Sequence, residues 1–156
     1  MFRHLLVPTD GSSLSEQTIE RAVSFAREGS ARITFLHVQP ELFGPDNLAF
    51  FGDAMVVNPG WNEEIARSNV AYAQHVLNQA QAKATAAEVS SEGVTVVSSV
   101  IYEAIIDTAK SHGCDLIFMA SHGRRGLAGF LLGSETQRVL THGSIPVLVY
   151  RTPEET

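Results

Sequence analysis

The chain has 156 residues, the size of one domain that can bury a substantial core. Hydrophobic residues make up 44% of it and charged residues 18%, which excludes a disordered or collagen-like protein. With 11 Lys and Arg against 17 Asp and Glu, the formal net charge of −6 disfavours a nucleic-acid binder that relies on bulk positive charge.

The sequence predicts neither a membrane span nor a secretory signal. No apolar run approaches the ~18 residues of a membrane-spanning helix. The short apolar run at the N-terminus ends at Pro8 without a small-residue cleavage site. Cys114 is the one cysteine, which excludes an intramolecular disulfide and fits a reducing compartment. We therefore expect a cytoplasmic protein with no membrane partner.

In chain order, the first predicted element is a buried strand over residues 2–7, followed by a turn. Ser13 and Glu16 have the spacing of a capping box, so Ser13 is expected to cap a helix that Gly29 ends. A second strand is predicted over residues 31–38.

Residues 39–60 follow no clear period and are rich in proline and glycine. A stretch of about twenty residues without a pattern is uncommon in a compact domain and is usually functional or mobile. Four of the chain's twelve aromatic residues lie in or beside it, namely Phe43, Phe50, Phe51 and Trp61. This predicts that the segment packs on its own domain, a partner chain or a ligand.

The second half of the chain alternates helices and strands in the same way. Ser134 and Gln137 form a second capping-box pattern, so Ser134 is expected to cap the helix after a glycine-rich loop. The elements predicted here are a helix over 62–90, a strand over 94–101, a helix over 104–111, a strand over 115–120, a helix over 134–140 and a strand over 145–150.

This alternation predicts an α/β fold. Strands that are apolar on both faces and alternate with helices indicate a parallel sheet covered by helices on both sides. We expect a single doubly wound domain over residues 1–151 and a polar tail over residues 152–156.

Two strand ends carry residues suited to a ligand, which in an open parallel sheet binds beyond the carboxyl ends of the strands. Pro8, Thr9 and Asp10 follow the first strand, and a glycine-rich segment over residues 121–133 follows the fourth. Glycines let an oxygen approach the backbone, and a helix N-terminus attracts anions. The pattern fits a phosphate-binding loop or a plain turn with a capping serine. Neither G-x-x-x-x-G-K-[ST] nor G-x-G-x-x-G after the first strand occurs.

The glycine-rich segment begins A-S-H-G at Ala120 and, nine residues later, ends G-S at Gly133 and Ser134. It resembles the nucleotide loop of the universal stress proteins, written Gly-x2-Gly-x9-Gly-Ser/Thr, with Ala120 at the first glycine position. The likeness covers nearly the whole chain, although residues 102–104 lack the Gly-x-Pro often found there. The flanking segments that resemble the family are residues 5–12, 31–38, 115–119 and 145–149.

The resemblance implies a five-stranded parallel sheet in the order 3-2-1-4-5 and, in one subgroup, ATP binding. AMP or ADP are alternatives to ATP, and Mg²⁺ is a possible companion of ATP. The resemblance also implies that Asp10 meets the adenine amino group, that the Val38 backbone meets the edge of the adenine ring, and that Ala120 meets the ribose. The phosphates would lie against Gly123, Gly133, Ser134 and the Glu135 backbone. The expected nucleotide-binding residues are Pro8, Thr9, Asp10, Val38, Met119, Ala120, His122, Gly123, Gly133, Ser134 and Glu135.

Other polar groupings favour catalysis or metal binding less. Ser121 and His122 are adjacent, but neighbours in a loop rarely point at each other and a triad needs a third orienting group. His112, Cys114 and Asp115 are too few to converge on a metal. We expect no catalytic residue and no metal site.

Two further pairs have a more local meaning. His4 and His37 lie within predicted strands and are expected to be structural. Arg124 and Arg125 lie inside the loop, where they either neutralise a phosphate or are solvated.

The last predicted strand favours a homodimer, which the resemblance also implies. In the family order the strand over residues 145–150 lies at a sheet edge, and an exposed apolar edge needs a cover. We expect two copies to pair these edges antiparallel about a two-fold axis. The alternative is a monomer whose edge is blunted by Pro146 and Arg151.

Three functions follow from these observations. The first is a small cytoplasmic ATP-binding stress-response protein that acts as a dimeric nucleotide-dependent regulator. The second is a dimeric protein-interaction module of the same fold that does not bind nucleotide. The third is an enzyme that binds a phosphorylated substrate in the loop. Because the sequence supplies no dedicated base or acidic pair for phosphoryl transfer, any ATP hydrolysis is expected to be slow.

Overall fold

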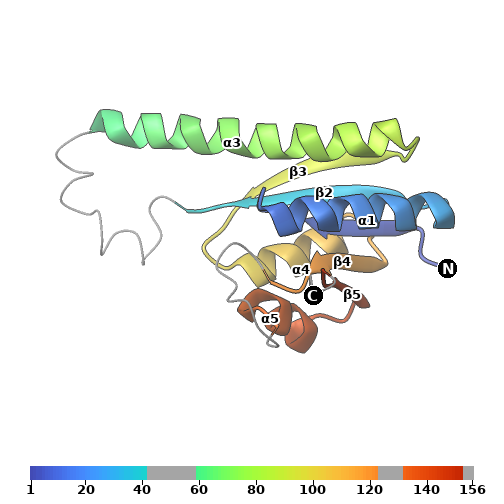
Figure 1. Ribbon diagram of the computed structural model, residues 1–156. Helices are drawn as coiled ribbons and strands as arrows, with labels where there is room; N and C mark the ends of the chain where they lie inside the picture. Colours follow the sequence, from blue (N-terminus) through green and yellow to red (C-terminus); the bar gives the residue numbers. More distant parts are fainter. Residues whose placement is uncertain (42–58, 123–131, 153–156) are drawn as a thin grey trace.

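The computed structural model describes residues 1–41, 59–122 and 132–152 (Figure 1). Every predicted strand and helix occurs, with shifted ends. The elements are β1 (His4–Pro8), α1 (Ser13–Gly29), β2 (Arg32–Gln39), α3 (Pro59–Ala86), β3 (Ser91–Val97), α4 (Ile101–Ser111), β4 (Leu116–Ala120), α5 (Ser134–His142) and β5 (Val147–Tyr150). The aromatic residues Phe43, Phe50 and Phe51 lie outside the described residues.

All five strands are parallel, in the order β3-β2-β1-β4-β5. This confirms the predicted order. The connection direction reverses between β1 and β4, which pair through Leu5 with Leu116 and Leu6 with Ile117. The carboxyl ends of the strands therefore share one edge, which faces left in Figure 1. An open sheet of this kind binds ligands at this edge, beside the reversal.

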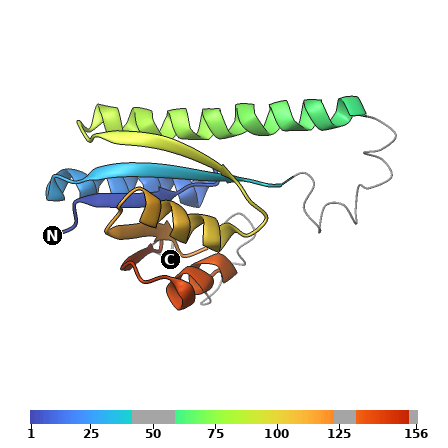
Figure 2. The ribbon, with the colours of Figure 1, turned by 180° about the vertical axis from the view of Figure 1, so that it is seen from behind.

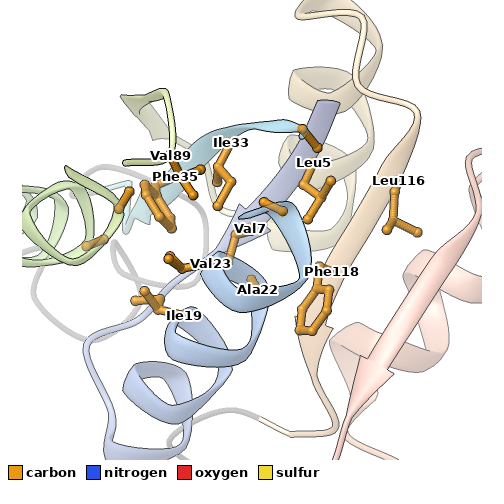
Figure 3. Close-up of a cluster of buried hydrophobic side chains, with 14 of the residues drawn as sticks. Leu5, Val7, Ile19, Ala22, Val23, Ile33, Phe35, Val89, Leu116 and Phe118 are labelled. Carbon is orange, nitrogen blue, oxygen red and sulfur yellow. The ribbon is translucent and has the colours of Figure 1, made fainter. Parts of the chain in front are cut away.

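Helices cover both faces of the sheet, as predicted. Successive strand residues point to opposite faces, so Leu5 and Val7 join one core cluster and Leu6 joins another. The first cluster packs α1 and α3 on the sheet, with Ile19 and Val23 facing Val7 and Phe35 (Figure 3). The second cluster packs α4 and α5 on the opposite face (Figure 2).

Both predicted helix caps are wrong by one residue. Ser12, not Ser13, caps α1, and its hydroxyl accepts from the Ser15 N–H at 3.2 Å. At α5 the cap position is Gly133, which offers no side chain, and Ser134 is the first helical residue. The capping-box pattern locates both helix starts closely, but the turn that enters each helix decides which residue stays outside it.

The ends of β3 and α4 also differ from the prediction, which followed the run of β-branched residues. Ile33 of β2 pairs with Ser91 and Gln39 pairs with Val97, so the neighbouring strand sets the span of β3. Ser98 then ends the strand, because its hydroxyl accepts from the Val100 N–H at 3.0 Å and α4 starts directly afterwards.

The helix α3 has 28 residues and lies along the strands, and its first turns project past the carboxyl ends of the strands (Figures 1 and 2). Trp61 and Val70 in the first half of α3 are 54% and 57% exposed, whereas Ala73 and Val76 further along are buried. Across the described part of the chain, no helix has an apolar stretch long enough to cross a membrane.

Candidate functional site

The turn after β1 lies at the shared carboxyl edge and is tied to both α1 and β2. The Thr9 N–H donates to the Leu36 carbonyl at 2.8 Å, which extends the pairing with β2 by one bond. The buried Thr9 hydroxyl lies 2.6 Å from the Ser15 hydroxyl. Thr9 therefore points into the start of α1, and it shapes the turn that follows.

Asp10 is held in one orientation by several hydrogen bonds. Its carboxylate oxygen Oδ1 accepts from the Ser12 N–H at 2.9 Å, its N–H donates to the Ser15 hydroxyl at 3.3 Å, and its carbonyl accepts from the Tyr72 hydroxyl at 2.8 Å. Gly11 follows with φ +76°, a conformation that favours glycine. The turn is thus preorganised around the Asp10 carboxylate.

Val38 presents its backbone beside this turn. Every second residue of a strand points its N–H and C=O to the same side. In β2 the Leu36 carbonyl points toward β1, where it accepts from the Thr9 N–H. Val38, two residues further along β2, therefore points its N–H and C=O past the last bond between the two strands. In the described ranges no backbone group of the β1 side pairs with it.

Sequence reasoning assigned His37 a structural role and missed Tyr72 as a site residue. His37 Nδ1 lies 2.9 Å from the Thr9 carbonyl, and because a carbonyl only accepts, Nδ1 carries the proton. The His37 and Tyr72 rings meet edge-on, with centroids 5.5 Å apart. Tyr72 lies in the apolar stripe of α3, a pattern that predicts packing only.

The end of β4 forms the second part of the candidate site at the carboxyl ends of the strands. Met119 is buried in the cluster under α4 and α5, and Ala120 is half-buried at the end of the strand. Ala120 does not have a positive φ, unlike Ser30 and Glu88. Its methyl group at the first motif glycine position therefore causes no backbone strain.

Gly133 brings the start of α5 against the end of β4. Its N–H donates to the Ser121 carbonyl at 2.8 Å, and a β-carbon on it would lie 3.0 Å from the His122 α-carbon. Room for a phosphate was the expected reason for this glycine. The structure adds a second reason, because the missing β-carbon lets the two ends of the loop lie in contact. Gly123 lies outside the described residues, as do Arg124 and Arg125.

The first turn of α5 has N–H groups without helical partners, and the bond from the Gly133 N–H to the Ser121 carbonyl holds this helix start at the end of β4. Ser134 is exposed there, so its hydroxyl is accessible to an anion. Glu135 lies next to it, with Oε1 3.5 Å from Arg138 and Oε2 buried without a hydrogen-bond partner in the described parts of the chain. The helix start thus carries a carboxylate beside the positive end of the helix dipole.

Ser121 and His122 do point at each other, contrary to expectation, with 3.2 Å between the hydroxyl and Nδ1. Ser121 is buried, and no described carboxylate bonds the His122 ring to complete a triad. Among the residues that the structure describes, the pair therefore has no third group of the kind that nucleophilic catalysis needs.

The described residues contain no group of three His, Cys, Asp or Glu side chains that could hold a metal. Burial raises the pKa of the Cys114 thiol to about 11, so it stays protonated and is a poor ligand. Asp115 is occupied as an acceptor of the Arg3 and His4 N–H groups, at 2.9–3.1 Å.

A cavity of about 290 Å³ lies between α1 and α3, on the face away from α5. It touches Thr9 and Gly11 and is otherwise lined mainly by apolar residues such as Val76 and Ala80. Its cation, Lys83, is paired with Glu20 at 2.7 Å. This cavity is therefore less suited to bind a phosphate than the start of α5 is.

Comparison of the sequence with known proteins identifies one family. The sequence model of the universal stress protein family matches residues 1–151. Universal stress protein YxiE of Bacillus subtilis is 30% identical over 97% of this chain and 100% of its own length.

Solved structures share the fold. The structure of MJ0577, a protein of Methanocaldococcus jannaschii, has a TM-score of 0.79 at 24% identity and covers 99% of both chains. A universal stress protein in complex with cAMP has a TM-score of 0.68 at 24% identity, covering 97% of this chain and 99% of its own. Neighbours from Archaeoglobus fulgidus, with dAMP, and Arabidopsis thaliana, with AMP, have TM-scores of 0.65 and 0.67.

Proposed function

Because the chain belongs to the universal stress protein family, we propose that it is a dimeric stress-response regulator that binds an adenine nucleotide, ATP foremost, at the carboxyl edge of its sheet. The observation that carries this proposal is the pairing of a fixed Asp10 carboxylate with the outward-facing backbone of Val38. Adenine presents an amino donor and a ring-nitrogen acceptor side by side. Asp10 accepts from the amino group, and the Val38 N–H donates to the ring nitrogen.

The phosphates belong at the other end of the site. The start of α5 offers free N–H groups and the Ser134 hydroxyl, which suits an anion. The three nucleotides in the neighbouring complexes, cAMP, dAMP and AMP, share adenine and one phosphate. This common part supports base recognition as the constant feature of the site. ATP, with or without Mg²⁺, extends it by two phosphates along the loop.

The same proposal includes slow hydrolysis of ATP, formation of a homodimer and a location in the cytoplasm. In the described part of the chain the Ser121–His122 pair has no third group to complete a triad, which supports a role for ATP as a bound signal that is hydrolysed slowly if at all. The dimer forms through β5, whose side chains pack on both core clusters and whose backbone faces outward along one edge. A cytoplasmic location agrees with the buried, reduced Cys114.

A second function, a dimeric interaction module without nucleotide, is favoured by one observation. The Glu135 carboxylate lies at the start of α5, where it competes with a phosphate for the positive end of the helix. This charge opposes phosphate binding, although the partly exposed ion pair with Arg138 at 3.5 Å offsets part of it.

Mass spectrometry of gently purified protein, followed by calorimetric titration with ATP, ADP, AMP, cAMP and GTP, separates the two functions. Co-purified adenine nucleotide and a clear preference for adenine over guanine are expected. An empty protein that releases no heat with any nucleotide contradicts the proposal and supports the interaction module.

A further inference from the structure

Two aromatic side chains hold consecutive carbonyl groups of the turn that carries Asp10. The Tyr72 hydroxyl of α3 donates to the Asp10 carbonyl at 2.8 Å, and His37 of β2 donates to the Thr9 carbonyl at 2.9 Å. The two rings meet edge-on at 5.5 Å with an interplanar angle of 69°. The turn is therefore supported from two elements that are far from it in the sequence.

Gly11 fits around this support. It has φ +76°, and a β-carbon on it would collide with the Tyr72 hydroxyl and lie 2.9 Å from Val76 Cγ2. Glycine at this position thus leaves room for the Tyr72 hydroxyl beside the turn.

The orientation of the Asp10 carboxylate follows from the same peptide. Oδ1 accepts from the Ser12 N–H, so the side chain is tied to the turn that Tyr72 fixes through the Asp10 carbonyl. Hydrogen bonds weaken steeply with angle. A small rotation of this turn therefore misaligns the carboxylate from an adenine amino group, while it leaves the start of α5 unchanged.

We propose that Tyr72, braced by His37, is a positioning residue that sets the preference of the site for adenine over guanine. The inference rests on the proposed adenine-nucleotide binding. Tyr72 acts through Asp10 and the turn at Gly11, without a contact of its own to the base.

Tyr72→Phe is the direct test, because it removes the hydroxyl and keeps the ring that packs against His37. Calorimetric titration is expected to show AMP and ATP binding weakened about three- to tenfold, the worth of one neutral hydrogen bond. GTP binding stays unchanged, so the adenine-to-guanine affinity ratio falls by the same factor. Tyr102→Phe is the matched control, because it removes a tyrosine hydroxyl that bonds Glu103 on α4; its ratio stays that of the wild type.

The outcomes separate the two proposals. A wild-type protein that binds no adenine nucleotide overturns both. A wild type that binds AMP, with a Tyr72→Phe variant of unchanged ratio or with equal losses for AMP and GTP, overturns the role of Tyr72 alone.

Discussion

Gly133 lies so close to His122 that a β-carbon on the glycine would be 3.0 Å from the histidine α-carbon. The Gly133 N–H also donates to the Ser121 carbonyl at 2.8 Å. The end of β4 and the start of α5 are therefore joined backbone to backbone, and this junction sets where the α5 N–H groups point.

Gly133→Ala is expected to lower both stability and nucleotide affinity, because the added methyl forces this junction apart. Overpacking of this kind costs about 1–3 kcal/mol of unfolding free energy. Urea denaturation measures the loss. Gly29→Ala is the control, since its β-carbon meets only the Phe2 carbonyl at 3.9 Å and the position is helical. A Gly133→Ala variant as stable as the wild type contradicts the close junction.

Asp10→Asn is expected to change base preference with little effect on the fold. The asparagine Oδ1 still accepts from the Ser12 N–H, and the carboxylate oxygen that is proposed to meet the adenine amino group becomes an NH₂ donor. ATP binding weakens by about 1.5–3 kcal/mol, whereas GTP, which presents a carbonyl at that edge, gains affinity. Titration with both nucleotides checks this. Equal losses for ATP and GTP rule out the contact.

Val149→Lys is expected to convert the proposed dimer into a monomer at micromolar concentration, because it places a charge on the β5 edge strand. Light scattering reports the mass. Val97→Lys is the matched control on the opposite edge strand, where the valine is 60% exposed, and it leaves the dimer intact. A Val149→Lys protein that remains dimeric moves the interface away from β5.

Acid is expected to destabilise the protein through His4. Burial, with a smaller effect of Arg32, lowers the pKa of His4 below its usual 6.5. The folded protein therefore holds His4 neutral. The contribution of His4 to the free energy of unfolding is complete above about pH 6.5 and is lost as the pH falls through the lowered pKa.

Urea midpoints between pH 7.5 and pH 5 measure this loss. His4→Gln is the comparison, because its amide can replace the Nε2 donor to the Thr34 hydroxyl, 2.7 Å away, without titrating. This variant is expected to show a smaller decline over the same range. Parallel curves for the two proteins assign the acid sensitivity to another group.

Cys114 is expected to resist a thiol reagent at pH 8 while the protein is folded. It is 6% exposed, and burial raises its pKa to about 11, so little thiolate is present. Ellman's reagent should label it only after urea is added. Rapid labelling of the folded protein contradicts its burial.

The fold could be predicted because its main signal is local. Leu5, Leu6 and Val7 alternate between two cores, and helical spacing follows each strand, which together indicate a parallel sheet with two covered faces. The family resemblance supplied the strand order. The α1 cap was missed by one residue because Ser12 and Ser13 both suit the cap, and the bond from the Ser15 N–H to the Ser12 hydroxyl distinguishes them.

The site was predictable only in part. Asp10 and Val38 were named through the resemblance, and their contact with a base stays a prediction. Tyr72 was missed because its contact with Asp10 spans 62 positions, and an aromatic residue in the apolar stripe of a helix predicts packing alone. Long-range contacts of this kind depend on how helices lie on the sheet, which periodicity does not describe.

The projecting start of α3 carries the chain's single tryptophan, Trp61, which is 54% exposed and belongs to neither core cluster. Its fluorescence is therefore that of an indole in contact with water, and the signal reports on the first turns of one helix. Any molecule that covers those turns shifts the emission to shorter wavelength, so the native sequence contains a label-free optical probe for partners of α3.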